Sequence, residues 1–264
     1  MSTYNMKVLD NAKNNYWGNR LLGELKYAIR LSDEYNDKYK DLIDSVLNYV
    51  EREKDEVITK NITKKCEEML SEIQDQAKSY TMLCAAHAHI DMNWMWRWDE
   101  TVSITLDTFK TMLDLMNEYP DFTFSQSQAS VYRIMEEHDP EGLAEIKKRI
   151  KEGRWEVTAS TWVEADKNIS NGESMVRHIL YTKNYLSNLL EIEPDSLCID
   201  FEPDTFGHSF NVPEVLNQGG IKYYYHCRGY DGYNLYNWQS KSGSKVLVHR
   251  EPDWYNSSIN IDMV

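Results

Sequence analysis

The segment from His87 to Asp91 places two imidazoles and a carboxylate at alternate positions, His87, His89 and Asp91. Residues two apart in an extended segment point to the same side, so these three side chains can share one face. Imidazole and carboxylate together suit Zn²⁺ or a similar divalent cation. We therefore predict a metal site here, with at least one further ligand supplied by a distant part of the chain.

A second polar cluster, "EPDTFGHS", covers residues 202–209. Asp204 lies at a predicted junction between a strand and a turn, where Gly207 permits a tight backbone. Asp204 is the best-placed candidate for the distant ligand, and His208 is a candidate for orienting that aspartate by a hydrogen bond. The alternative is that Asp204 caps the helix predicted near residues 211–218, although Ser209 or Asn211 would cap it more naturally.

Each of these residues also has an ordinary structural interpretation. His89 could be a buried histidine with satisfied hydrogen bonds, and Asp91 could cap the segment that follows it. Trp94 is either a core aromatic or a stacking platform beside the metal. Arg228 could form a surface ion pair, but its predicted position near the other polar residues favours a functional role.

The elements that must position these residues alternate between two kinds. Short apolar runs predict strands, and amphipathic segments between them predict helices, which together indicate parallel strands with crossover helices. The expected strands cover residues 80–87, 122–126, 155–161, 196–201 and 221–227, and a hairpin is expected around Ser242 and Gly243.

Polar residues follow each of the five expected strands. They are His87, His89 and Asp91, then Gln126 and Gln128, then Trp162, Glu164 and Asp166, then Asp204 and His208, and last Arg228. In parallel α/β folds, the carboxyl ends of the strands form the face that carries chemistry. Five consecutive strands that each place polar residues at one face support an active site more strongly than any single motif does.

Composition limits the kind of partner. The net charge of −14 over 264 residues argues against nucleic acid and anionic membrane surfaces, which both attract basic patches. Four scattered cysteines without a Cys-x-x-Cys pair indicate reduced thiols. No apolar run approaches the roughly 20 residues that span a bilayer, and no signal peptide is visible. These features together predict a cytoplasmic protein.

Three motifs in the same order resemble the family 38 α-mannosidases: "AHAHIDMNWMWRWDET", "GRWEVTASTWVEADKNISNGESMVRH" and "IDFEPDTFGHSFNVPEVLNQGGI". The resemblance runs from about residue 80 to about residue 230. It implies metal-dependent, retaining hydrolysis of terminal α-mannosyl residues in a mannose-containing glycan, with zinc as the usual ion. It also implies an α/β fold, a seven-stranded barrel, here incomplete.

Carried over by position, the resemblance assigns roles to individual residues. His89 and Asp91 would be metal ligands, and Asp204 would be both the catalytic nucleophile and a ligand. Trp94 would stack on the mannose ring, and Arg228 would contact the nucleophile or the substrate. His87 and His208 would have supporting roles. In the family, a fourth ligand and the acid/base aspartate lie well downstream of the nucleophile, so we expect them beyond Val264.

The resemblance also divides the chain. Residues 1–75 are expected to form a helical segment, and residues 76–264 the N-terminal part of the barrel domain. The isolated chain is then expected to be nearly inactive, and its unpaired barrel edge would favour self-association into a homo-oligomer. Glu164 and Asp166 are the first alternatives for an acid/base group within the chain.

Two rival interpretations remain open on the residues alone. Metal-dependent amidohydrolases and related phosphoesterases also open with His-x-His, and they would need His208, His226 and His249 as further ligands. A sugar-binding fragment with an incomplete catalytic site is the second rival. Turnover of an aryl α-mannoside, turnover of an amide or phosphoester, and binding without turnover distinguish the three.

Overall fold

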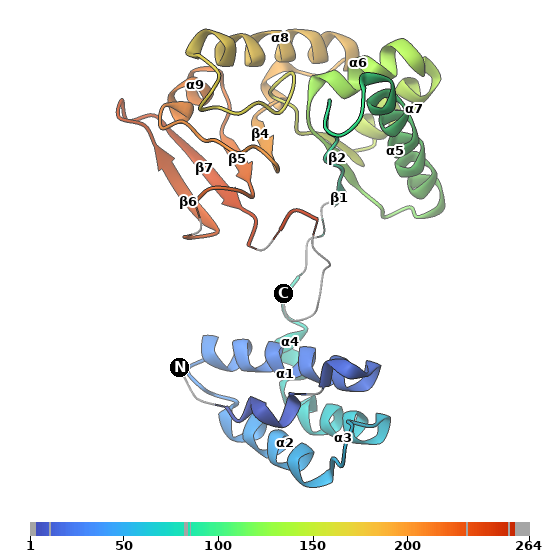
Figure 1. Cartoon of the computed structure of the whole chain (residues 1–264), viewed down its shortest axis with the longest axis vertical. Coiled ribbons are helices and arrows are strands. Elements are labelled where there is room, and N and C mark those ends of the chain that lie inside the picture. The colour runs from blue at the N-terminus through green and yellow to red at the C-terminus, as the bar shows by residue number, and fades with distance from the viewer. Residues whose placement is uncertain are drawn as a thin grey trace. The chain divides into compact units, whose positions relative to one another are not determined.

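The computed structural model describes residues 4–10, 12–81, 84, 86–230, 232–252 and 254–256. The chain forms two compact units, and the division between them falls between residues 84 and 85. Each unit has a hydrophobic core of its own. The first unit is helical, and the second contains the strands (Figure 1).

The first unit packs amphipathic helices around one apolar core. Apolar residues at helical spacing, such as Leu21, Leu25 and Ala28, are buried because a helix brings them onto one face. Asn15 caps the first helix by accepting a hydrogen bond from the backbone of Gly18 at 2.9 Å. The helices are α1 (Tyr16–Glu34), α2 (Lys40–Glu53), α3 (Lys60–Leu70) and α4 (Gln74–Ala77), with 3₁₀ turns η1 (Met6–Leu9), η2 (Ala12–Asn14) and η3 (Ser71–Ile73).

The second unit begins with a parallel sheet of three strands in the order β1-β2-β3. The strands are β1 (Ala86–His87), β2 (Phe124–Gln126) and β3 (Trp155–Val157), and they are connected by the helices α5 (Trp98–Glu118), α6 (Ala129–His138) and α7 (Pro140–Lys151). The expected parallel strands with helical crossovers are therefore confirmed. The strands are shorter than expected, and residues 82, 83 and 85 of the first expected strand lie outside the described residues.

The second sheet has four strands in the order β4-β5-β7-β6. The strands β4, β5 and β7 are parallel, whereas β6 runs antiparallel to β7 because the two form the predicted hairpin. Gly243 allows that turn, with a φ of +94°. The elements are α8 (Gly172–Leu190), η4 (Pro194–Ser196), β4 (Ile199–Glu202), α9 (Val212–Gln218), β5 (Tyr223–His226), β6 (Leu235–Gln239) and β7 (Lys245–Arg250).

The expectation of a seven-stranded α/β barrel, complete or partial, is wrong for this structure. The strands form two separate sheets, one parallel and one mixed. The break falls between β3 and β4, because β3 stops at Val157 and the segment after it meets β4 through side chains. Ser160 Oγ donates to Asp200 Oδ1 at 3.1 Å in place of a backbone ladder. A closed barrel requires every strand to be paired on both sides.

Helix α8 joins the cores of the two sheets. Leu186 and Leu190 near its end belong to the core of the three-stranded sheet, whereas Ile179 near its middle packs with the core of the four-stranded sheet. One helix therefore holds the two sheets together, and Figure 1 shows it lying along the side of the second unit that carries α6 and α9. Over the described part of the chain, no helix combines the length and the apolar character needed to cross a membrane.

Candidate active site

The carboxyl ends of the parallel strands bring three predicted residues together. His89 and Asp91 follow β1, and Asp204 is the second residue after β4. His89 Nε2 lies 3.3 Å from Asp91 Oδ1 and 3.9 Å from Asp204 Oδ2. One ligand atom from each residue can be chosen so that all three lie within 4.8 Å of one another. The site therefore combines residues that are more than one hundred positions apart in sequence.

The structure does not support the alternative in which Asp91 and Asp204 are helix caps. Helix α5 begins at Trp98 with Arg97 as its N-cap residue, well beyond Asp91. Helix α9 begins at Val212 with Asn211 as its N-cap residue, well beyond Asp204. Both aspartates thus point into the site instead of closing a helix end.

Arg228 binds the carboxylate of Asp204 from the end of β5. Its Nε and Nη2 atoms lie 2.6 Å and 2.5 Å from the same oxygen, Oδ1 of Asp204. The guanidinium carbon is also 4.6 Å from the ring centre of Phe206 and 4.7 Å from that of Trp254. The arginine is thereby fixed in position, and Oδ2 of Asp204 faces His89.

The sequence did not assign a role to Glu164 beyond a general acid/base candidate, yet it is central to the site. Its Oε2 lies 2.8 Å from His89 Nδ1, and its Oε1 accepts backbone hydrogen bonds from Asp204 at 2.6 Å and Thr205 at 3.2 Å. The side chain is only 6% exposed. The sequence signal was its place after the third expected strand, but two carboxylates follow that strand, and only the structure shows which faces His89.

Glu164 is itself held in place by Gln128. The backbone N–H of Glu164 donates to Gln128 Oε1 at 3.0 Å, and Gln128 Nε2 donates to the carbonyl of Ile90 at 2.9 Å. Gln128 has a φ of +66°, a conformation that side-chain-bearing residues rarely adopt. Such strained residues cluster at functional sites. Gln128 thus links the segment after β1 to the segment after β3.

The charges around His89 determine its protonation. Burial by itself lowers the pKa of His89, but the contact with Glu164 and the charges of Asp91 and Asp204 outweigh burial, so the pKa is raised. His87 behaves in the opposite way. Burial and the neighbouring His89 lower the pKa of His87 to about 3, so it is neutral at physiological pH.

His87 lies away from the three ligand atoms. Its ring nitrogens are 3.3 Å from Ser125 Oγ and 3.4 Å from Ser127 Oγ, and its ring packs 4.2 Å from that of Phe201. His208 does not orient Asp204 as expected, because its Nδ1 is hydrogen-bonded to the hydroxyl of Tyr224 at 2.6 Å. Both histidines therefore contact the scaffold around the site and not the ligand cluster.

Trp94 is exposed and does not line the cavity that contains His89. Its ring is 64% exposed and meets Trp96 edge-on, with the ring centres 5.3 Å apart. The segment beside it is tied to α5, because Trp96 Nε1 donates to Thr101 Oγ1 at 3.0 Å and this hydroxyl donates to the carbonyl of Met92 at 2.6 Å. Helix α5 thus anchors the segment that carries both His89 and Asp91.

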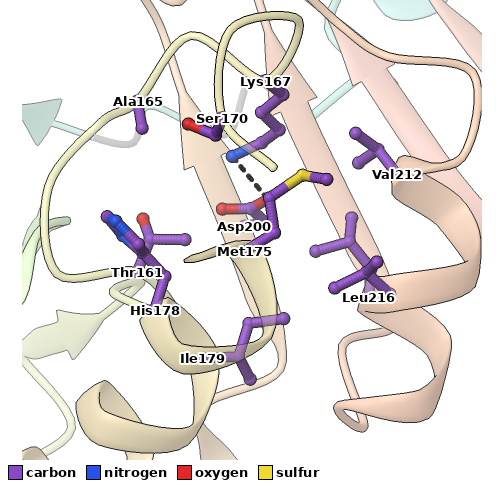
Figure 2. Close-up of a pocket in the computed structure, with 11 residues that line it drawn as sticks. Thr161, Ala165, Lys167, Ser170, Met175, His178, Ile179, Asp200, Val212 and Leu216 are labelled. Atoms are coloured by element: carbon purple, nitrogen blue, oxygen red, sulfur yellow. Dashed lines mark ion pairs between the residues drawn. The ribbon is translucent and has the colours of Figure 1, made fainter. Parts of the chain in front are cut away.

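A buried cluster of charges supports the loop that carries Asp204. Lys167 Nζ lies 2.7 Å from Glu202 Oε1 and 3.3 Å from Asp200 Oδ2, and all three side chains are buried. Figure 2 shows Lys167 pointing down to Asp200 beside a small cavity of about 20 Å³ that His178 also lines. Burial alone would lower the pKa of Lys167, but the two carboxylates raise it above its ordinary value.

The same cluster reaches the backbone around Asp204. Thr205 Oγ1 donates to Glu202 Oε2, and the backbone N–H of Lys167 donates to the carbonyl of Gly207 at 3.0 Å. Burial raises the pKa of Glu202 well above its ordinary value, although Lys167 opposes this shift. Glu202, through Thr205, and Lys167, through Gly207, therefore both hold the loop that carries Asp204.

The ligand cluster opens into a cavity of about 310 Å³. Carboxylates and amides make up half of the residues that line it, which suits a ligand rich in hydroxyl groups. Tyr255 lies next to His89, with the ring centres 5.5 Å apart. The residues that line the cavity are His89, Ile90, Asp91, Met92, Asn93, Gln128, Val163, Glu164, Asp166, Asp204, Thr205 and Phe206.

The three ligand atoms fit a divalent cation after a small adjustment. Ligands that share one Zn²⁺ at about 2.1 Å lie at most about 4.2 Å apart. The three atoms lie within 4.8 Å of one another, so side-chain shifts of less than about 1 Å would bring them within range. One imidazole nitrogen and two carboxylate oxygens are the donor set that zinc and similar ions accept.

An α/β domain that gathers a histidine and two aspartates at the carboxyl ends of parallel strands is typical of a metal-assisted hydrolase. Comparison with known families narrows this class. Residues 79–263 match the model of the glycosyl hydrolases family 38 N-terminal domain. The chain therefore belongs to glycosyl hydrolase family 38, as the three sequence motifs predicted.

Individual relatives agree with this assignment. The chain is 34% identical over 197 residues to alpha-mannosidase G of Dictyostelium discoideum, and 32% identical over 195 residues to alpha-mannosidase 2C1 of Homo sapiens. These alignments cover 71% and 70% of this chain but only 18% of each relative. The fold is similar to that of an alpha-mannosidase from Enterococcus faecalis V583, with a TM-score of 0.59, 20% identity, and coverage of 65% of this chain and 20% of that one.

Proposed function

We propose that this chain is the N-terminal part of a retaining α-mannosidase that binds a divalent cation, with zinc as the expected ion, and uses Asp204 as the nucleophile. The family membership and the names of the relatives support hydrolysis of terminal α-mannosyl residues in a mannose-containing glycan. His89, Asp91 and Asp204 are the proposed metal ligands. The proposal for Asp204 follows from its surroundings.

The observation that carries the proposal is that the two oxygens of Asp204 face different partners. Arg228 binds Oδ1, whereas Oδ2 faces His89 at 3.9 Å. A glycosidase nucleophile acts as a carboxylate, and the guanidinium of Arg228 holds the Asp204 carboxylate in one orientation. The same arrangement leaves one oxygen oriented toward the cavity, where a sugar would lie.

The chemistry follows from this geometry. A carboxylate oxygen of Asp204 forms a bond with the anomeric carbon while the glycosidic C–O bond breaks and the leaving oxygen takes a proton from a second carboxylic acid. Water then attacks the glycosyl ester, gives its proton to that second group, and releases mannose with its configuration retained. When bound, the cation would coordinate sugar hydroxyls and help to orient the ring. We propose Trp94, whose ring is exposed, as a stacking surface for the sugar.

The structure disfavours the amidohydrolase and phosphoesterase alternative. That chemistry would need further histidines beside His89, and His208, His226 and His249 were the candidates. His208 and His226 line a different cavity, which contains Tyr236 and Trp238, and His249 stacks on Tyr225 with the ring centres 5.8 Å apart. In the described part of the chain, the grouping of residues able to hold a metal is His89, Asp91 and Asp204.

A mechanism-based fluorinated mannosyl inhibitor tests the assignment. Incubation with the intact protein, followed by proteolysis and mass spectrometry, should locate the label on the peptide that contains Asp204. The variant Asp204→Asn should remain unlabelled and should lose turnover of an aryl α-mannoside. Labelling of another carboxylate would overturn the role of Asp204, and sugar binding without turnover by the intact protein would favour a carbohydrate-binding role.

A further inference from the structure

One carboxylate group contacts both the histidine ligand and the loop of the nucleophile. Glu164 Oε2 lies 2.8 Å from His89 Nδ1, while Oε1 accepts the backbone N–H groups of Asp204 and Thr205. Among the described residues, neither His89 Nδ1 nor Glu164 Oε2 has an aligned hydrogen-bond partner. The two atoms are therefore the natural partners of each other, and a small rotation of the ring would align them.

The chemistry of the two groups determines where the proton of His89 sits. A neutral imidazole carries one N–H, and an ionised carboxylate can only accept a hydrogen bond. Nε2 also has a carboxylate partner, since it is hydrogen-bonded to Asp91 Oδ1 at 3.3 Å. The Glu164 carboxylate lies closer, at 2.8 Å, and is only 6% exposed, whereas Asp91 is 33% exposed and can bond to water, so the N–H belongs on Nδ1 and the lone pair on Nε2. Nε2 is the nitrogen that faces Asp91 at 3.3 Å and Asp204 at 3.9 Å. A cation can bind only the nitrogen that carries the lone pair.

The position of Glu164 does not depend on a cation. Its backbone is hydrogen-bonded to Gln128, and three residues later Lys167 is buried against Glu202 and Asp200. Figure 2 shows the ion pair of Lys167 with Asp200. Glu164 is also absent from the group of residues whose ligand atoms converge. These contacts distinguish it from a metal ligand, since both of its oxygens are directed at protein groups.

We propose that Glu164 is a positioning residue whose carboxylate selects the Nδ1–H form of His89 and, through its other oxygen, holds the backbone of Asp204. This inference relies on the proposed function only in treating His89 as a ligand. A single side chain would then set the geometry of two ligands that lie on different sheets. Hydrogen-bond partners of metal-binding histidines act in this way, and their loss typically lowers metal affinity about 10- to 100-fold.

The variant Glu164→Gln tests the proposal sharply. The amide can keep an oxygen for the backbone of Asp204, but it then presents an NH₂ group to His89 Nδ1. The proton should move to Nε2, where it competes with a cation. Ring ¹⁵N shifts of His89 in the histidine-labelled, metal-free chain report this tautomer directly, read from the neutral ring at the upper end of a pH titration. A His89→Gln sample assigns the signal.

We expect the Nδ1–H form in the wild type, the Nε2–H form in Glu164→Gln, and a 10- to 100-fold weaker affinity for Zn²⁺ in the variant. Glu156→Gln, the same change at an exposed position on β3, should alter neither. An Nε2–H form in the wild type, or unchanged tautomer and affinity in Glu164→Gln, would overturn the proposal. The wild-type spectrum decides the tautomer even if the variant fails to fold. Neither measurement involves a sugar, so failure of the mannosidase assignment would be separately visible in the labelling experiment.

Discussion

Two nitrogens of Arg228 contact the same oxygen of Asp204, at 2.6 Å and 2.5 Å, and leave the other oxygen facing His89. This one-sided contact differs from the paired fork in which an arginine binds both oxygens of a carboxylate. It fixes the rotation of the aspartate and directs its other oxygen toward His89. Catalysis, metal binding and stability should depend on this contact and on the contacts around it.

Replacing the arginine should impair catalysis more than binding of the cation. Arg228→Met should lower kcat/KM of the intact protein on an aryl α-mannoside by about 10²-fold, since a misplacement of about 1 Å can cost that much. Arg228→Lys should recover only part of the loss, because lysine keeps the charge without the planar donors. Arg52→Met, at an exposed position in the first unit, is the control. Equal activity of Arg228→Met and wild type would contradict this role.

Zinc should stabilise the second unit through the ligand cluster. At a concentration about 100 times Kd, a ligand that binds only the folded state adds about 2.7 kcal/mol to the free energy of unfolding. The thermal unfolding midpoint should therefore rise with Zn²⁺ and fall again with a chelator. His89→Asn should abolish the rise, whereas His138→Asn, at the exposed end of α6, should preserve it. A full rise in His89→Asn would exclude this site.

Removal of the buried positive charge of Lys167 should lower the free energy of unfolding. Lys167→Met leaves Asp200 and Glu202 buried without a positively charged partner, and breaking a buried ion pair in this way typically costs about 3–5 kcal/mol. The exposed pair of Lys151 with Glu191, 3.1 Å apart, offers a matched comparison. Urea denaturation of Lys151→Met should show a midpoint within experimental error of the wild type. Similar midpoints for both variants would refute the structural role of Lys167.

Acid should destabilise the second unit through His208. Burial, with smaller contributions from His226 and Lys167, lowers the pKa of His208 from 6.5 to about 4. Between these pH values the unfolded chain binds a proton that the folded chain does not. The stabilisation is therefore complete above pH 6.5 and is lost as the pH falls toward 4, by about 2–3 kcal/mol for this residue.

Tryptophan emission can follow this loss, because every tryptophan except Trp17 lies in the second unit. Urea unfolding should be compared at pH 7.5, 5.5 and 4.5. The variant His208→Asn should show a shallower decline than the wild type, and His138→Asn should follow the wild-type decline. A pH dependence that is identical in all three proteins would assign the acid sensitivity to other groups.

Gly207 should tolerate a side chain poorly. A methyl group there would lie 2.3 Å from Asp166 Oδ1 and 2.6 Å from Asn168 Nδ2, so either these two side chains or the loop that carries Asp204 would have to shift. Gly207→Ala should therefore reduce activity by about 10-fold or more, as expected for a displaced catalytic group. At Gly172, where nothing lies within 4 Å of the added atom, the same substitution should be neutral or slightly stabilising. Activity assays and melting curves of the two variants provide the comparison.

Much of the second unit follows from local sequence patterns. Apolar runs followed by amphipathic segments predict parallel strands with crossover helices, and the hairpin at Ser242 and Gly243 follows from its turn residues. These predictions succeed because hydrophobic periodicity and turn chemistry act over short distances. The three motifs also identify the family correctly, since each preserves residue types at fixed spacing.

The arrangement of the strands could not be predicted in the same way. Whether β3 pairs with β4 depends on side chains such as Ser160 and Asp200, which are far apart in sequence. The contact of Glu164 with His89 could not be predicted for a similar reason. Asp166 follows the same strand, and both carboxylates line the cavity. Only the contact with His89 distinguishes them, and that contact depends on how the segments after β1 and β3 pack.

The site draws His89 from the three-stranded sheet and Asp204 from the four-stranded sheet, and no strand of one pairs with a strand of the other. A bound cation would therefore cross-link the three-stranded and the four-stranded parts of the second unit. Contacts between such distant residues require closure of a long loop and tend to form late in folding. Interactions that are absent from the transition state mainly slow unfolding. The metal should thus prolong the lifetime of the native state much more than it accelerates folding, which makes it a determinant of kinetic stability.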